Sequence, residues 1–213
     1  DLPMALHDMI KDTIAAHKRI IFNGNGYSDE WVAEAERRGL PNIKCMVDAV
    51  PALVKPEAVE IFEKHGVYTK AEMESRAEVM YETYSKTINI EALTMIDMAK
   101  KQIVPATIKY QTSLAESVNA IKAASSAVDT SVQEALMADI STNLKDMYAA
   151  LAHLEEVAGK AEAMEEGAEQ GHYYHDVVFT AMDELRKPAD KLEMLVAKSA
   201  WPFPSYGDLI FEV

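Results

Sequence analysis

The sequence has a single cysteine, Cys45, so no disulfide can form within the chain, and this fits a reducing compartment. Glycine and proline are scarce, with eight residues of each, and most of them lie between periodic stretches. We therefore expect long elements joined by short loops. Aromatic residues make up 8% of the chain, while 49% is hydrophobic and leans towards Ala, Leu, Ile, Val and Met. That mixture favours helices.

Basic residues are also few, with 21 Lys and Arg against 35 Asp and Glu and a formal charge of −14. This sign repels phosphate backbones and anionic lipids, which argues against nucleic acid and membrane surfaces as partners. No apolar run reaches the roughly 18 residues of a membrane span, and the opening DLPMALHDMIKD lacks the basic start of a signal peptide. We expect a cytoplasmic protein. Because the first residue is Asp1 and helical patterning begins at once, we also expect a cut from a longer chain.

Three shorter helices are predicted in the first third of the chain. Residues 3–22 carry apolar side chains at helical spacing and should end at the NGNG loop of residues 23–26. Ser28 is placed to cap a helix that ends at Gly39. A third helix should run from Pro56 to His65.

Longer helices follow. Thr69 and Glu72 form a capping box, and a 4-3-4-3 spacing predicts a buried stripe of Met73, Ala77, Met80, Tyr84, Thr87, Glu91, Thr94 and Met98. Pro105 should kink or break this helix, and Asp129 or Thr130 should cap the next one. Two further stripes are the clearest in the chain: Val132, Leu136, Ile140, Leu144, Met147, Leu151, Leu154 and Ala158, then Val178, Met182, Leu185, Ala189, Leu192 and Val196. Pro188 should bend the last helix without ending it.

These patterns predict a mainly α fold, an antiparallel helical bundle whose long helices form a hairpin-like arm. We expect short helices over residues 1–68, the long-helix bundle or arm over 69–200, and an extended apolar tail over 201–213. Pro202 and Pro204 oppose helix in the tail, which should dock on a surface or add a short strand.

Few residues suggest chemistry. Glu169, His172, His175 and Asp176 are of metal-binding types at helical spacing, but a di-iron bundle needs a second Glu-x-x-His motif that the sequence lacks. We favour a polar helix start there. The NGNG loop follows a helix and lacks the Lys-Ser/Thr pair of a phosphate loop, so it is interpreted as a turn. With no catalytic triad or HExxH motif either, we assign no catalytic, cofactor-binding or metal residue.

Three stretches carry a family resemblance: FNGNGYSDEWVAEAERRGLPN, KTINIEALTMIDMAKKQIVPA and the closing WPFPSYGDLIFEV. Together they resemble the C-terminal region of type III glutamine synthetase, the large-subunit bacterial form. Between about residues 105 and 200 the likeness is mainly one of helical pattern.

The resemblance implies a parent ligase of nitrogen metabolism that joins ammonia to glutamate, uses ATP with Mg²⁺ or Mn²⁺, and assembles as stacked hexameric rings. Its catalytic motifs lie upstream of this region, so no catalytic residue is carried over. The implied partners are the upstream catalytic domain, on which residues 1–68 would pack, and neighbouring subunits of a homo-oligomer.

Two other interpretations remain open. The chain could be an independent helical protein-interaction module, which the reading frame upstream of Asp1 would decide. It could also be a metal-dependent bundle enzyme centred on His172 and His175, which metal analysis would test.

Overall fold

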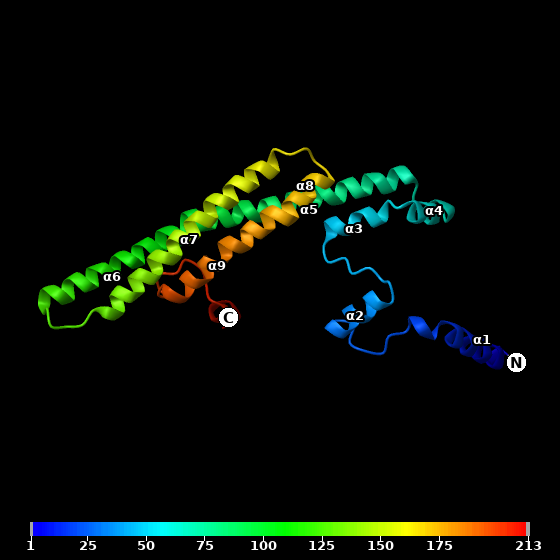
Figure 1. Cartoon of the computed structure of the whole chain (residues 1–213), viewed down its shortest axis with the longest axis horizontal. Coiled ribbons are helices and arrows are strands. Elements are labelled where there is room, and N and C mark those ends of the chain that lie inside the picture. Colours follow the sequence, from blue (N-terminus) through cyan, green and yellow to red (C-terminus); the bar gives the residue numbers. More distant parts are fainter. Residues whose placement is uncertain (1, 212–213) are drawn as a thin grey trace. The chain divides into compact units, whose positions relative to one another are not determined.

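The computed structural model describes residues 2–211, and within that range every regular element is helical (Figure 1). Contacts divide the chain into two compact units, with the boundary between Cys45 and Met46. No helix among the described residues has the length and hydropathy of a membrane span.

The first unit contains α1 (Leu2–His17), the 3₁₀ turn η1 (Lys18–Ile20) and α2 (Asp29–Arg37). As predicted, the Ser28 hydroxyl caps α2 by accepting a hydrogen bond from the Trp31 backbone N–H. The rings of Phe22 and Trp31 pack with their centroids 4.4 Å apart. These contacts fix the NGNG loop against α2.

The second unit starts with α3 (Met46–Leu53) and α4 (Pro56–Lys64), followed by α5 (Lys70–Met98). The predicted capping box at the start of α5 is confirmed, with Thr69 and Glu72 bonded reciprocally. We expected the first domain to run to residue 68, but α3 groups with α5 because Val47 and Val50 are buried in the second unit. The first unit accordingly ends earlier than the sequence suggested.

Pro105 does not break the long helix. After α5 the chain makes the π-turn η2 (Ala99–Ile103) and continues as α6 (Val104–Ala124), so helical structure runs through the proline. In the π-turn the Val104 N–H donates to the Ala99 carbonyl, five residues back. This wider turn lies directly before Pro105. In a regular helix the proline ring would clash with the carbonyl four residues earlier, and proline has no N–H to donate to that carbonyl.

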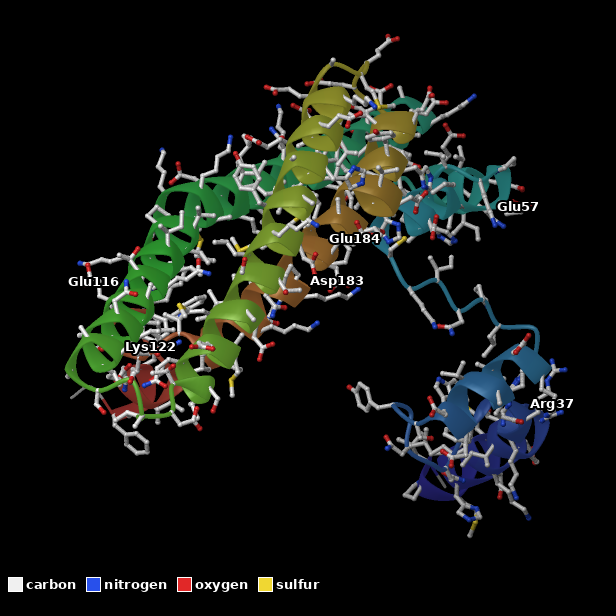
Figure 2. The ribbon with its side chains drawn as sticks, turned by 60° about the vertical axis from the view of Figure 1, so that its left-hand side comes forward. Arg37, Glu57, Glu116, Lys122, Asp183 and Glu184 are labelled. Atoms are coloured by element: carbon white, nitrogen blue, oxygen red, sulfur yellow. The ribbon has the colours of Figure 1, made fainter. Side chains whose placement is uncertain are left out.

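The hairpin-like arm is confirmed: α6 and α7 (Ser131–Glu162) lie side by side, and the chain reverses between them (Figure 1). Of the two predicted caps, Thr130 is the N-cap residue of α7 but makes no side-chain capping bond, while Asp129 Oδ1 accepts from the Ser131 N–H at 2.9 Å from the position before it. At this tip Lys122, labelled in Figure 2, pairs with Glu134 at 2.5 Å.

The chain then returns through α8 (Ala168–Tyr173), the π-turn η3 (Tyr174–Val178) and α9 (Phe179–Leu195). Helix α9 packs along α7 and passes through Pro188 without ending, as expected. The second unit is thus a bundle of long helices, in agreement with the predicted fold class.

The core forms mainly between α5, α7 and α9. The predicted stripes of α7 and α9 supply much of it, including Ile140, Met147, Leu151, Leu154, Val178, Leu185 and Leu192. The stripe predicted for α5 is wrong at most positions after Ala77, although Tyr84 is partly buried against the core. Met80 is 42% exposed, and the residues actually buried are Met73, Ala77, Tyr81, Ser85, Ile88 and Ala92.

The tail is extended only in part. Trp201 and Phe203 pack against the core, but residues Tyr206–Phe211 form the helix α10 instead of an extended segment or a strand. The cause is a local cap: Asp208 accepts from the Ser205 backbone N–H at 2.8 Å, and Ser205 Oγ accepts from the Asp208 N–H at 3.4 Å. The prolines precede this cap and therefore do not oppose the helix. Val213 lies outside the described residues.

Candidate functional site

His172 and His175, the two candidate metal ligands of the sequence, pair with different carboxylates. His175 Nδ1 lies 2.7 Å from Asp176 Oδ1, while His172 Nδ1 lies 3.7 Å from Asp48 Oδ1 on α3. Among residues 2–211 no three His, Cys, Asp or Glu side chains are grouped so that they could hold a metal ion. The structure therefore does not bring Glu169 and Asp176 together with both histidines around one point.

The NGNG loop builds the turn into α2. Asn25 Oδ1 accepts from the Tyr27 N–H at 3.0 Å, and the Asn25 carbonyl accepts from the Ser28 hydroxyl at 3.0 Å. Gly24 lies under the Phe22 ring, where an added Cβ would come within 2.5 Å of Phe22 Cζ. A side chain at residue 24 would therefore displace the Phe22 ring, and the polar groups of the loop serve the turn.

The feature of the first unit that most resembles a binding surface is one side of α1. None of the 16 residues of this helix is buried. Five of its large apolar side chains lie within one stripe of the helix, and each is at least 45% exposed: Leu2, Leu6, Met9, Ile10 and Ile14. We call these five residues the α1 apolar face. The sequence predicted the helix from the spacing of its apolar residues, but not that the whole stripe would be exposed.

A helix of this length that packs none of its apolar side chains is unusual. Short helices are marginally stable in water, and most helical stability in proteins comes from packing an amphipathic face. Contiguous exposed apolar patches mark interaction sites in soluble proteins. The α1 apolar face is therefore suited to packing against another apolar surface.

A cluster of hydrogen-bonded charges in the same unit lies at the end of α2. The Arg37 and Arg38 guanidinium groups both donate to Glu34 at 2.6 Å. Their hydrogen bonds lower the pKa of the Glu34 carboxyl to about 2. Arg38 also donates to the Arg19 carbonyl at 3.0 Å and so ties α2 to the turn after α1. Figure 2 labels Arg37 on this helix.

The tail of the second unit carries a similar pair. Lys198 Nζ lies 2.6 Å from Asp208 Oδ1, and this contact, with the bonds from Ser205, lowers the pKa of Asp208 to about 2. Leu209, Ile210 and Phe211 on α10 are at least 61% exposed. The polar side of α10 thus holds the helix in place while apolar side chains face outward.

Comparison with known proteins connects these helices to a family. A family model described as the glutamine synthetase C-terminal domain matches residues 5–122. A glutamine synthetase of Butyrivibrio fibrisolvens is 38% identical over 213 residues, which are 100% of this chain and 30% of that protein. A type-3 glutamine synthetase of Dictyostelium discoideum is 29% identical over 97% of this chain and 29% of its own length.

The chain thus spans about three tenths of the length of the curated relatives that it matches. The matches include a protein named as type 3, as the three sequence stretches suggested. Since the family model covers more than half of the chain, the chain belongs to the glutamine synthetase C-terminal domain family.

Proposed function

We propose that this chain is the helical, noncatalytic C-terminal part of an ATP-dependent glutamate–ammonia ligase and that it serves the structure and assembly of that enzyme in the cytoplasm. Relatives named as glutamine synthetases match the whole chain with under a third of their own length, which supports this assignment. The observation that carries it is the α1 apolar face, because a helix that buries none of its residues needs a partner surface.

The partner that we assign to this face is the upstream catalytic domain. The residues that it offers are aliphatic or Met, and obligate contacts within one enzyme are more hydrophobic than transient ones. Burying Ile10, which is 52% exposed, would contribute about 1 kcal/mol, since complete burial of such a side chain contributes about 1.5–3 kcal/mol. Five such residues are enough to hold α1 in place.

ATP and Mg²⁺ or Mn²⁺ belong, in this proposal, to the catalytic portion of the parent enzyme. The described residues do not fit these groups: they bring no three metal-ligating side chains of the acid, His or Cys types together, and the NGNG loop is occupied in a turn. We expect no γ-glutamyl transfer from this chain alone when ATP, Mg²⁺, glutamate and ammonia are supplied. Measurable activity would contradict the proposal.

The role of the α1 apolar face can be tested in the full-length enzyme with a matched pair of variants. Ile10→Asp places a charge on the face, whereas Ala15→Asp places the same charge on the opposite side of α1. We expect Ile10→Asp to lower the amount of assembled, active enzyme by at least tenfold, since a charge buried without a partner is strongly unfavourable. Ala15→Asp should change the amount of assembled, active enzyme by no more than about twofold. Equal behaviour of the two variants would remove the docking role.

The long arm is proposed to brace the catalytic domain or to contact neighbouring subunits. Its support is the length of α7, which runs for 32 residues. Removing residues 69–199 from the full-length enzyme should change its assembly, as measured by light scattering. An unchanged assembly would rule out this role for the arm.

A further inference from the structure

A polar pocket of about 230 Å³ lies in the second unit, where α5 meets the end of α7 and the start of α8. Each of the eight residues that line it is polar. They are Glu82, Ser85, Lys86 and Asn89 of α5, Glu162 at the end of α7, Glu166 in the following loop, and Gln170 and Tyr174 beyond it. Polar side chains from three successive parts of the bundle therefore converge on one pocket.

Two hydrogen-bonding atoms in the walls of this pocket have no partner among the described residues. Ser85 is 4% exposed, and its Oγ makes no hydrogen bond there; the Oδ1 atom of Asn89 is also buried and unbonded. Nearly all buried polar atoms in proteins find a partner, and leaving one without a partner costs stability. Ser85 Oγ and Asn89 Oδ1 are both able to accept, so the pocket presents two acceptors that need a donor.

The charge around these acceptors is negative. Glu82, Glu162 and Glu166 contribute three negative charges and Lys86 one positive charge, which leaves −2. Lys86 is already paired with Glu82. A neighbouring pocket shares Glu82 and Glu166 and adds the Glu78 carboxylate. The pocket therefore favours a cation that can also donate hydrogen bonds.

The carboxylates are not grouped as metal ligands, because no three acidic or His side chains among the described residues are close enough to hold one ion. A protonated amine meets the requirements of the pocket. Its N–H groups can donate to Ser85 Oγ and Asn89 Oδ1, and its charge is balanced by Glu162 and Glu166. We propose that this pocket binds a small aliphatic primary amine in its protonated form.

The probe for this proposal is 1,4-diaminobutane, and its control is the same diammonium with every nitrogen fully methylated. Both have the same charge and chain, but the control has no N–H donor. At a tenfold excess over its Kd, the diamine should raise the Tm of the chain by roughly 3–6 °C. In NMR spectra it should shift the backbone amides of Ser85 and Asn89 in a saturable manner. Equal effects of diamine and control, or no effect of the diamine, would overturn the proposal.

A matched pair of variants locates the effect. Ser85→Ala removes the acceptor hydroxyl from the pocket, while Thr107→Val removes a hydroxyl that is also buried and without a partner but lies outside the pocket. Neither substitution should lower the Tm without amine, because each removes an unsatisfied group. We expect Ser85→Ala to weaken diamine binding at least tenfold and Thr107→Val to leave it unchanged.

Glu162→Gln, whose side chain is exposed, provides a second variant that should fold normally and also weaken binding. Retained affinity in both Ser85→Ala and Glu162→Gln would contradict the proposal. So would a Ser85→Ala protein that is less stable than the original without amine, because its hydroxyl would then have a partner already.

Discussion

The packing around Gly171 leads to a prediction that compares two glycines in helices. Gly171 lies in α8, which contacts both α3 and α5. An added Cβ at this position would lie 3.1 Å from Cδ1 of Tyr81 and 3.3 Å from Cγ1 of Val47. Gly159 lies in α7, and an added Cβ there has no neighbouring atom within 4 Å. The two sites therefore differ in crowding while sharing a helical backbone.

The magnitudes follow from this difference. Alanine is favoured over glycine in a helix interior by about 0.8–1.0 kcal/mol, so Gly159→Ala should raise the free energy of unfolding by about that amount. At Gly171 the same gain is offset by overpacking, which typically costs about 1–3 kcal/mol. Tyr81 and Val47 are poorly able to move, since both are buried and the Tyr81 hydroxyl donates to the Val47 carbonyl at 3.4 Å. Gly171→Ala should therefore be less stable than Gly159→Ala by about 1–3 kcal/mol.

The assay is urea unfolding followed by the helical circular dichroism signal, with both variants measured beside the unchanged chain. A second comparison adds Val47→Ala, which removes Val47 Cγ1, one of the two atoms within 3.3 Å of the new methyl. In the Val47→Ala background, Gly171→Ala should lower the free energy of unfolding by less than it does alone. The coupling free energy between the two substitutions should be roughly 0.5 kcal/mol or more. If Gly171→Ala stabilised the chain as much as Gly159→Ala does, the close approach of α8 to α5 and α3 would be refuted.

Three further predictions concern the cap of α5, a core leucine and the loss of stability at low pH. Thr69→Ala should cost about 1 kcal/mol of stability by removing the capping box of α5, measured by urea unfolding. Leu154→Ala, at a site with 0% exposure, should cost about 2–5 kcal/mol, whereas Leu93→Ala, at 48% exposure, should cost far less in the same assay. Because the pKa values of Glu34 and Asp208 are lowered to about 2 from 4.5 and 3.8, their contribution is complete above about pH 5 and is lost as the pH falls towards 2. Carboxyl titration by NMR measures both pKa values, and midpoints near 4 would contradict the two pairings.

Local signals in the sequence predicted local structure well. The Ser28 cap and the Thr69–Glu72 box were visible because every participating residue lies within four positions. The cap that starts α10 has the same form, with Ser205 three residues before Asp208, but it follows two prolines, from which the sequence predicted an extended tail. A proline restricts the backbone of the residue before its ring and not of those after it, so Pro202 and Pro204 leave residues 206–211 able to form a helix.

The surfaces and pockets could not be predicted in the same way. The helix carrying the α1 apolar face was expected from its spacing, yet its exposure depends on which surface it meets. The polar pocket joins α5 to the end of α7 and the start of α8, which are distant in the sequence. No periodicity within one helix reveals that Ser85 and Glu162 line the same pocket.

The error in the α5 stripe has a geometric cause that also explains the pocket. A 4-3-4-3 spacing keeps side chains on a seam that runs along a neighbouring helix, as in a coiled coil. The buried residues from Met73 to Ser85 instead follow steps of four. Each such step turns the buried side by about 40° around the helix, and this row of residues is the ridge used when helices cross at an angle. Helix α5 contacts α3, α8 and η3 along its length, so its buried side turns as the partners change. That rotation brings Ser85, a polar residue that a straight seam would leave outside, into the interior beside Gly171.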